Sequence, residues 1–342
     1  MKILYYLTRN PSQFSFLYNI YQLHDGPIYF PNYSGKIPKY LSHNVKIFNN
    51  LDQIKKYNPD FILHTDFFPI LDGNWKNIYI GHGFGYDAFI NNCSDNLILS
   101  HDEYTKNGSG TWEYFDYIFV PSELIKEEVS KEYNIDINKI RCIGYPRLDK
   151  IKKSYLISYN NKKKLLYAPS WSLKSSLLIM KDLVIKLSKY FNVIVLFHSN
   201  TIYSPSEKVD AARYIIKNKS ESLQIVYRNE YDKLFNDVDD KNILNFNDDM
   251  NLLQSLIIST DVLLCDSKSG AGWDALFLES PYIKISAKKE LTLDDLIKKI
   301  NNVKGRNKFN YCGKEYSVED IFGKKDGKNS QRCINILNNL LN

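Results

Sequence analysis

The sequence of 342 residues lacks the features that mark several classes of protein. Its five cysteines are odd in number and widely spaced, and no CxxC pair occurs, so neither a zinc site nor a disulfide framework is indicated. No window approaches the roughly 20 apolar residues of a membrane-spanning helix. The opening residues 1–7 are too few for a signal peptide and lack a cleavage region. These absences lead us to expect a cytoplasmic protein.

Positive charge is modest and scattered along the chain. The formal net charge is +6, and the densest clusters are at residues 162–164 and 324–325. A nucleic-acid-binding protein would need a basic stripe or a known module, and neither is visible, so we expect no nucleic-acid partner. The charge suits anionic substrates or an anionic membrane surface, although a mildly basic soluble protein is the commoner case. Peripheral contact with the inner face of the cell membrane is therefore a hypothesis.

Short apolar runs alternate with helical patterns along the chain. The length favours two domains, and 44% hydrophobic with 25% charged residues is typical of a globular protein. Alternating strands and helices predict mostly parallel sheets that bind ligands at the carboxyl ends of their strands. A lysine-rich polar stretch, residues 150–163, separates two such series. We predict an α/β fold of two Rossmann-like, doubly wound domains facing a cleft, residues 1–155 and 156–342, with the C-terminal helix packing back on the first.

The apolar runs predict the following elements. In the first domain we expect strands at 2–7, 27–30, 45–48, 61–63, 78–80 and 117–120, and a helix over 11–23. In the second domain we expect strands beginning at 164 and at 193–197, 224–227, 243–246, 262–265 and 282–285. The helices between them are expected at 177–190, 208–217, 250–259 and 273–278.

A loop of small residues follows one apolar strand of the second domain. It runs from Asp266 through Ser267, Ser269 and Gly270 to Asp274, and a helical pattern follows it. A strand, a small-residue loop and a helix start together present free backbone N–H groups to an anion, usually a phosphate. The alternative is an ordinary turn whose glycines only allow tight packing.

Three histidines stand at the ends of predicted strands. His82 lies between Gly81 and Gly83, and its ordinary pKa near 6.5 lets it accept a proton at neutral pH. We favour a general base or substrate ligand there over a histidine that caps a loop, and His64 is a weaker candidate. His198 ends a strand of the second domain, where a positively polarised imidazole could neutralise a pyrophosphate. A loop histidine bonded to backbone is the alternative for His198.

Two further patterns involve charged residues. The sharp turn from Gly144 to Asp149 contains Arg147, which could pair with Asp149 or face a phosphate, and the structural pair is the simpler interpretation. Asp237 and Asp239 resemble a DxD metal signature, but they precede a strand, so we predict a solvated loop. We expect no protein-held metal and no tightly bound cofactor, while a free divalent cation could take part.

In this order the motifs resemble the CDP-glycerol glycerophosphotransferase family, which includes the teichoic-acid primases and polymerases. The matching motifs are Gly-His-Gly at 81–83, Gly-Tyr-Pro-Arg-Leu-Asp at 144–149, Tyr-Ala-Pro-Ser-Trp at 167–171, the strand-end His198, and Asp-Ser-Lys-Ser at 266–269. The chain departs from the family pattern at Ser172, where a basic residue is usual, and at Ser199, where proline is usual. Its Asp-Ser-Lys-Ser loop is also one residue longer.

The resemblance implies a GT-B fold with an acceptor-side first domain and a nucleotide-donor second domain. It implies a transferase in bacterial cell-surface polymer synthesis, teichoic-acid-like or capsular. Glycerol phosphate or a related polyol phosphate would move from a CDP-linked donor to a hydroxyl of a lipid-linked or saccharide acceptor. By the resemblance, His82 would be the base. The donor would be held by His198, Ser170, Ser267, Ser269 and Gly270, and substrate would also contact Gly83, Arg147 and Asp274.

Other functions fit the same motifs. One is a GT-B glycosyltransferase that uses a CMP- or UDP-linked sugar for capsule or lipopolysaccharide. Another is a non-catalytic GT-B-like protein that binds a nucleotide without transfer. The glycine-rich loop is also similar to that of UDP-GlcNAc 2-epimerases, which share the GT-B fold. Donor identity and turnover without an acceptor distinguish these functions.

Overall fold

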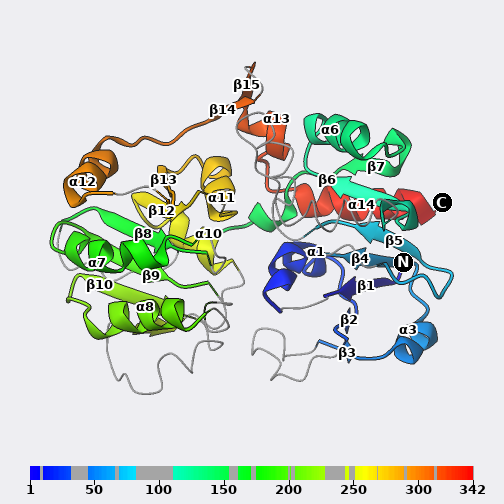
Figure 1. Cartoon of the computed structure of the whole chain (residues 1–342). Helices are drawn as coiled ribbons and strands as arrows, with labels where there is room; N and C mark the ends of the chain where they lie inside the picture. Colours follow the sequence, from blue (N-terminus) through cyan, green and yellow to red (C-terminus); the bar gives the residue numbers. More distant parts are fainter. Residues whose placement is uncertain are drawn as a thin grey trace. The chain divides into compact units, whose positions relative to one another are not determined.

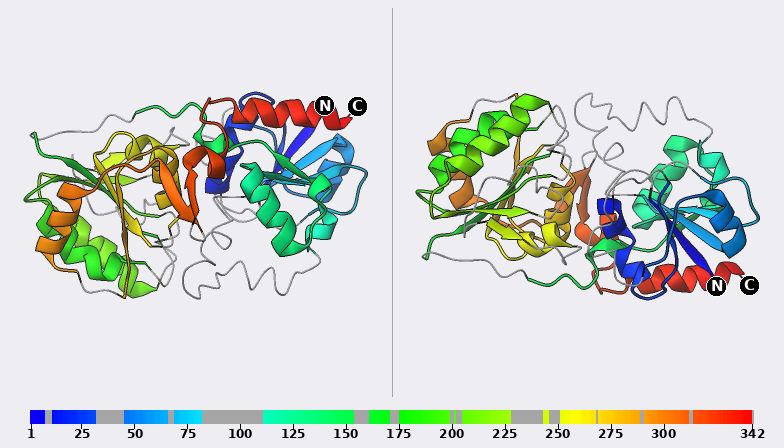
Figure 2. Two further views of the ribbon diagram at one scale, coloured as in Figure 1. Left: turned by 90° about the horizontal axis from the view of Figure 1, so that it is seen from above. Right: turned by 90° about the horizontal axis from the view of Figure 1, so that it is seen from below.

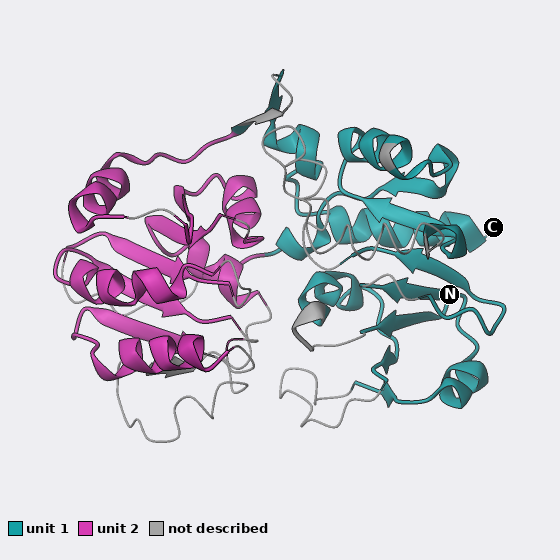
Figure 3. Cartoon of the chain, in the orientation of Figure 1, with its two compact units in different colours: residues 1–150, 308–342 teal, residues 151–307 magenta. Residues whose placement is uncertain are grey.

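The structure is a computed structural model of the whole chain. It describes residues 1–7, 11–31, 45–65, 69–81, 111–153, 161–170, 175–198, 201, 205–227, 243–245, 251–267, 269–288, 291–311 and 314–341. The chain divides into two compact units, shown in different colours in Figure 3. Unit 1 comprises residues 1–150 and 308–342, and unit 2 comprises residues 151–307.

This division differs from the predicted one at the C-terminal end of the chain. We expected residues 156–342 to form the second domain, with only the last helix packing back, but the whole segment from Lys308 belongs to unit 1. The physical reason is a buried carboxylate. Asp149 accepts hydrogen bonds from Asn329 Nδ2 at 2.8 Å and from the backbone N–H and hydroxyl of Ser330 at 2.7 and 2.8 Å. Charge-assisted bonds of this kind are roughly twice as strong as neutral ones, so they hold the returning segment to unit 1.

Unit 1 is built on a parallel sheet whose described strands run in the order β3-β2-β1-β4-β5-β6-β7. The strands are β1 (Ile3–Tyr6), β2 (Ile28–Tyr29), β3 (Ile47–Phe48), β4 (Phe61–His64), β5 (Lys76–Tyr79), β6 (Tyr117–Val120) and β7 (Ile140–Cys142). The order reverses between β1 and β4, as in doubly wound folds. Because helices cover both faces of such a sheet, its central strands are buried, and all four residues of β1 are buried.

Helices lie on both faces of this sheet. Those in the described ranges are η1 (Pro11–Phe16), α1 (Tyr18–Tyr21), α3 (Leu51–Tyr57), η2 (Thr111–Tyr114), α6 (Glu123–Tyr133), η3 (Ile137–Lys139), η4 (Pro146–Leu148), α13 (Val318–Phe322) and α14 (Asn329–Leu341). Ile54 of α3 packs on Leu4 and Tyr6, whereas Tyr5 packs on Phe14 and Tyr21 beside α1 and α14. The two chain ends lie close together in every view of Figures 1 and 2.

The helix predicted over residues 11–23 is instead two short pieces. The chain forms the 3-10 turn η1 and then only the four residues of α1. Leu17, the residue before α1, has no side chain that could bond the free N–H groups of a helix start. A short antiparallel hairpin, β14 (Lys308–Tyr311) with β15 (Lys314–Ser317), precedes α13.

Unit 2 contains a second parallel sheet, and its described strands follow the order β11-β10-β9-β8-β12-β13. These strands are β8 (Lys164–Ala168), β9 (Asn192–Leu196), β10 (Leu223–Tyr227), β11 (Ile243–Asn245), β12 (Val262–Asp266) and β13 (Tyr282–Ile285). The described helices are α7 (Leu177–Leu187), α8 (Ser206–Lys217), α10 (Leu252–Ile257), α11 (Ala271–Phe277) and α12 (Leu293–Asn302). The strand order reverses between β8 and β12, and loops that follow two such strands diverge and leave a crevice for a ligand.

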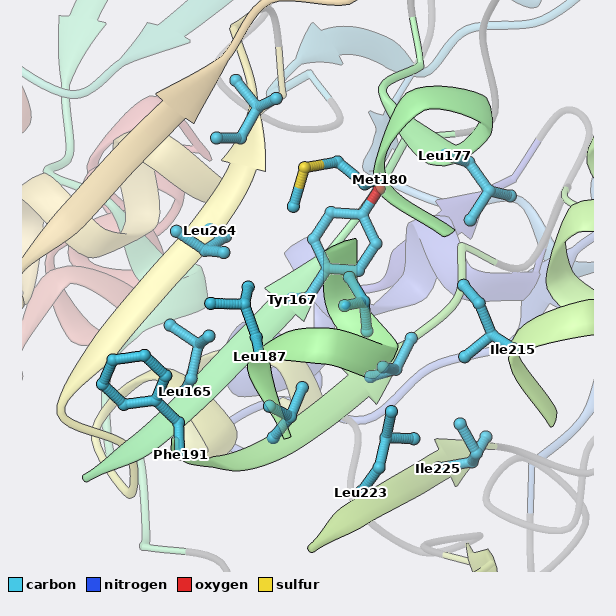
Figure 4. Packing of buried hydrophobic residues seen from close by; sticks show 14 of the residues in the cluster. Leu165, Tyr167, Leu177, Met180, Leu187, Phe191, Ile215, Leu223, Ile225 and Leu264 are labelled. Carbon is cyan, nitrogen blue, oxygen red and sulfur yellow. The ribbon is translucent and has the colours of Figure 1, made fainter. Parts of the chain in front are cut away.

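Successive side chains of β8 pack on opposite faces of the sheet, as the period of a strand requires. Leu165 and Tyr167 pack with Leu177 of α7 and with residues of α8 and α12 (Figure 4). Leu166 and Ala168 instead contact residues of α10 and α11. Both faces of the sheet are therefore covered, which is the doubly wound α/β arrangement predicted from the sequence. None of the helices in the described ranges has the length and apolar character needed to cross a membrane.

Candidate functional site

In unit 2 a buried carboxylate ties two loops together where the strand order reverses. Asp266, the last residue of β12, is only 1% exposed. Its Oδ2 accepts from the backbone N–H of Ser170 at 2.6 Å and its Oδ1 from that of Ser176 at 2.8 Å. Ser170 and Ser176 stand at the two ends of the loop that joins β8 to α7. Asp266 therefore holds both ends of the loop between β8 and α7 next to the loop that follows β12.

Two backbone N–H groups of the small-residue loop after β12, which we predicted to face a phosphate, are bonded within unit 2 instead. The N–H of Ser267 donates to the carbonyl of Ile285, and the N–H of Ser269 donates to that of Asp266, both at 2.9 Å. Both groups serve to hold the loop against the sheet and are not available to a phosphate. Gly270 has φ −58°, which any residue adopts, and is exposed, with no atom within 4 Å of the position of an added Cβ. The surface at Gly270 is therefore open to a ligand.

Asp274 lies inside unit 2. It is 1% exposed, and its Oδ2 accepts from Gln254 Nε2 of α10 at 2.5 Å. This bond joins α11 to α10 below the loop. We predicted that Asp274 contacts substrate. In the structure it is buried and its partner is Gln254.

His198 stands at the same sheet edge as Ser170 and Asp266, because β9 and β12 both neighbour β8. It follows β9 by two residues, is half-buried, and its carbonyl accepts from Thr201 N–H at 2.8 Å. Three of the predicted donor-binding segments, which begin at residues 170, 198 and 267, thus leave adjacent strands at their carboxyl ends. This is the edge at which α/β sheets bind ligands.

Lys208 is a residue that our sequence interpretation missed. It lies in the first turn of α8 and is 4% exposed. Burial lowers the pKa of its ammonium, and the nearby carboxylates of Asp266 and Glu207 oppose that effect. A signal was present in the sequence, because Lys208 is spaced with Ala211 and Ile215 along the buried face of a helix. A lysine on the apolar face of a predicted helix indicates a buried cation, and here that cation lies close to the donor loops.

In unit 1 the predicted base itself, His82, and the neighbouring Gly83 lie outside the described residues. The residue before them is described: Gly81 has φ +82°, a conformation that favours glycine. The N–H groups of Ile80 and Gly81 both donate to the carbonyl of His64, at 2.9 and 3.3 Å. The turn that leads into His82 is therefore fixed to the end of β4.

His64 is not a base. It has no exposed surface, and its Nε2 lies 2.7 Å from Asn77 Oδ1, while Tyr6 and Phe115 pack edge-on against its ring. Burial lowers the pKa of His64 from 6.5 to about 3, and the bond with Asn77 offsets only part of this effect. The imidazole is neutral at physiological pH and cannot reach a substrate. Its role is to hold β4 and β5 together.

A pocket opens in unit 1 at the carboxyl ends of β5, β6 and β7. Its walls include Gly81, Pro121 and Gly144, and its lining is mostly apolar. Among the described residues that line it, Arg147 is the one that carries a charge. The guanidinium carbon of Arg147 lies 4.1 Å from the centre of the Phe16 ring, while the carboxylate of Asp149 bonds to α14. Arg147 therefore faces the pocket, and the carboxylate that we had considered as its structural partner is held by the C-terminal helix.

The predicted DxD pair, Asp237 and Asp239, lies outside the described residues. Within the described part of the chain, no group of three or more His, Cys, Asp or Glu side chains is arranged to hold a metal ion.

Solved structures with a similar fold include enzymes of cell-wall synthesis. The wall teichoic acid polymerase TagF matches with a TM-score of 0.53 and 14% identity, over 99% of this chain and 88% of that one. A TagF variant soaked with CDPG matches with a TM-score of 0.54 and 14% identity, over 98% and 88%. Anabaena Alr3699/HepE in complex with UDP matches with a TM-score of 0.50 and 11% identity, over 99% and 95%. At these identities the matches show the fold alone, which is GT-B.

No curated protein sequence matches the chain. The CDP-glycerol:poly(glycerophosphate) glycerophosphotransferase family matches residues 72–290, which is more than half of its length. This range contains the strand ends after β5, β6 and β7 in unit 1 and those after β8, β9 and β12 in unit 2. The chain therefore belongs to the CDP-glycerol:poly(glycerophosphate) glycerophosphotransferase family, a family of transferases that build cell-surface polymers.

Proposed function

We propose that the protein transfers glycerol phosphate, or a related polyol phosphate, from a CDP-linked donor to an acceptor hydroxyl during synthesis of a bacterial cell-surface polymer. The family match over residues 72–290 is the observation that carries this proposal. In this reaction the acceptor oxygen attacks the phosphorus that bears the polyol. The bond from that phosphorus to CMP breaks, and CMP leaves. A base must take the hydroxyl proton, and positive groups must neutralise the charge that develops on CMP.

The residues at the strand ends suit these tasks. We propose His82 as the base, because it directly follows the fixed Gly81 turn of unit 1. We propose that unit 2 holds the donor, because three of its loops leave neighbouring strands at one edge. Asp266 is a positioning residue there, and Lys208 adds positive charge near it. The donor would contact Ser170, His198, Gly270 and the hydroxyls of Ser267 and Ser269; Gly83 and Arg147 would contact the acceptor, and Asp274 would support the donor loop from inside.

A donor screen tests the proposal. We would measure the thermal shift of the purified protein with CDP-glycerol, CDP-ribitol, CMP-sialic acid and UDP-sugars. The proposal predicts stabilisation by a CDP-polyol above the others, since a ligand that binds only the folded state raises its stability. Preference for a CMP- or UDP-linked sugar would instead identify a glycosyltransferase. Binding without any transfer or hydrolysis would identify a non-catalytic protein.

Substitution of His82 tests the chemistry. Loss of a general base typically costs about 10²–10⁴-fold in rate, so His82→Ala should lose turnover by that factor while its melting temperature is retained. His24→Ala is the matched control, because His24 bonds to Met1 at the opposite edge of the same sheet. Equal turnover in the two variants would remove His82 from the mechanism. We also propose that no tightly bound cofactor is needed, so transfer should survive dialysis against EDTA unless a free cation assists it.

We propose that the acceptor is a lipid-linked or saccharide chain and that the protein acts in the cytoplasm, at the inner face of the cell membrane. Lysine-rich segments mixed with aromatic residues suit contact with anionic lipid. Co-sedimentation with anionic vesicles at low salt, lost at high salt, would support such contact, and no co-sedimentation at low salt would exclude it.

A further inference from the structure

Lysines from four separate segments gather at the amino-terminal edge of the sheet in unit 2. The strands β8, β9 and β10 are parallel neighbours, so all three begin at this edge, and the predicted donor loops leave the opposite edge. The helices α7 and α8 end here because each leads into the next of these strands. This lysine edge comprises Lys162, Lys163 and Lys164 at the start of β8, Lys186 and Lys189 at the end of α7, Lys217 and Lys219 at the end of α8, and Lys298, Lys299 and Lys304 at the end of α12.

Hydrogen bonds join these segments into one surface. Lys162 Nζ donates to the carbonyl of Lys189, beyond the end of α7, at 2.8 Å. Lys163 Nζ lies 3.5 Å from the carbonyl of Asn301 in the last turn of α12. The hydroxyl of Ser220, which follows α8, donates at 2.7 Å to the serine that follows α7. The ends of all three helices therefore lie around the start of β8.

Few acids balance the charge of the lysine edge. The described acidic residues at the same ends of the strands and helices are Glu221, Asp261 and Glu279. The carboxylate of Asp261 already accepts from the backbone N–H of Lys164 at 2.7 Å. Lys186, Lys189 and Lys217 are exposed, and none of the three forms an ion pair with a described residue. This edge therefore presents an excess of positive charge to whatever faces it.

The needs of the helix ends account for only part of this charge. Lysines stabilise the negative end of a helix, and Lys162 and Lys219 do so directly, because their Nζ atoms donate to the carbonyls of Lys189 and Ile216. The exposed lysines remain available to a partner. Tyr190, which follows α7 among them, is 51% exposed. A tyrosine has an apolar ring and a polar tip, which suits the boundary between lipid and water.

We propose that the lysine edge of unit 2 is a docking surface for an anionic lipid bilayer. Nucleic acids and other soluble polyanions are typically held in a groove by arginine forks and stacked aromatic rings. The charges here are instead lysines, spread over three helix ends and a strand start, and such compact charges suit a broad anionic surface. That this bilayer is the inner face of the cell membrane rests on the proposed function, whereas the binding itself does not.

The donor loops stay free in this arrangement. They leave the other ends of the same strands, and α7, with 11 residues, by itself spans about 16 Å between the two edges. Salt screens charges over about 8 Å at physiological ionic strength, so the lipid field is weak at the donor edge. Donor binding should therefore be the same with and without vesicles.

Co-sedimentation of the full chain with vesicles tests the surface. The probes are vesicles of phosphatidylcholine alone and of an equimolar mixture with phosphatidylglycerol. The wild type should bind the mixed vesicles only. The triple variant Lys186→Gln, Lys189→Gln and Lys217→Gln should bind them about 100-fold more weakly, because each lysine near an anionic surface contributes about fivefold. The same three positions changed to arginine should bind as the wild type does, since the charge is kept.

The matched control removes the same charge from unit 1. Lys56, Lys131 and Lys324 are exposed lysines of that unit, and their combined change to glutamine should leave vesicle binding at the wild-type level. Hydrogen exchange of the unsubstituted protein gives a measurement that needs no variant. Mixed vesicles should protect the amides at 186–191 and 216–222.

Three results would overturn the docking surface: undiminished vesicle binding by the lysine-edge glutamine variant, equal weakening in the unit 1 control, or protection confined to unit 1. Tighter binding of soluble heparin than of the vesicles, lost in the same variant, would identify a soluble polyanion as the occupant and overturn the membrane assignment. Failure of the proposed function looks different. In that case no CDP-polyol would act as a donor, while vesicle binding would still depend on the lysine edge.

Discussion

The buried histidine of unit 1 makes a quantitative prediction about acid. His64 stays neutral in the folded protein down to a pKa of about 3, but in the unfolded chain it takes up a proton near pH 6.5. Between these two values the unfolded state binds more protons than the folded state. The stability of unit 1 must therefore fall as pH falls below about 6.5.

The size of the effect at pH 5 depends almost entirely on the unfolded value, because the folded pKa lies well below 5. Protonation of the unfolded histidine then lowers the free energy of unfolding by about 2 kcal/mol relative to pH 7.5. His64→Gln removes the titration and leaves an amide that can still donate to Asn77. This variant loses ring contacts with Tyr6 and Phe115, so it will be less stable at every pH. The variant differs from the wild type in that its free energy of unfolding falls less when the pH is lowered.

The assay is urea unfolding at pH 7.5 and pH 5.0, followed by pulsed hydrogen exchange of separate peptides. Peptides over 61–81 report on unit 1, and peptides over 164–168 report on unit 2. The wild type should lose about 2 kcal/mol more than His64→Gln between the two pH values in the unit 1 peptides, and the two proteins should change equally in the unit 2 peptides. An equal loss in the unit 1 peptides of both proteins would refute the reasoning.

Two further substitutions probe the buried carboxylates. Asp266→Asn keeps one acceptor oxygen for two N–H groups, so it should lower the free energy of unfolding by about 1–3 kcal/mol, measured by urea unfolding. It should also weaken donor binding, measured by titration with the donor. Asp261→Asn is its control, because Asp261 accepts from Lys164 N–H at the other end of the same strands, and unchanged donor binding in both variants would contradict the positioning role. Asp149→Asn should cost about 1.5–3 kcal/mol of unit 1 stability through its bonds to Ser330, and faster hydrogen exchange over 329–341 should accompany the loss. Exchange as slow as in the wild type would mean that α14 is held by other contacts.

Most of the parallel strands could be predicted from the sequence. The predicted bounds of β6 and β13 equal those of the structure, and β12 differs only by the inclusion of Asp266. Strands buried on both faces appear as short uninterrupted apolar runs, and turn residues bound them, so this signal is strong. The hairpin at 308–317 has no such run, because most of its described side chains are exposed. Our predictions omitted this hairpin and α13, although they did place the C-terminal helix against the first domain.

The site divides in the same way. Strand-end positions such as Ser170 and His198 follow from local pattern, because a parallel sheet brings its carboxyl ends to one edge. The partners of the buried carboxylates do not follow from local pattern. Asp266 bonds to N–H groups 90 and 96 residues earlier, and Asp149 bonds to Ser330, 181 residues later. Only the fold brings these atoms together. The N–H of Ser267 likewise bonds to the carbonyl of Ile285 on the neighbouring strand, so the local pattern predicted it as free.

The return of the chain to unit 1 sets an order on its synthesis. Residues 151–307 are continuous, so unit 2 can complete its fold as soon as it leaves the ribosome. Unit 1 begins first but must wait, with its Asp149 carboxylate lacking its partners Asn329 and Ser330, until α14 is made. A nascent chain stopped near residue 307 would thus carry a finished unit 2 and an unfinished unit 1. The two ends lie close together in unit 1, so a circular permutant could link residue 342 to residue 1 and open the chain between residues 307 and 308. Unit 1 would then be one continuous segment and would be made before unit 2.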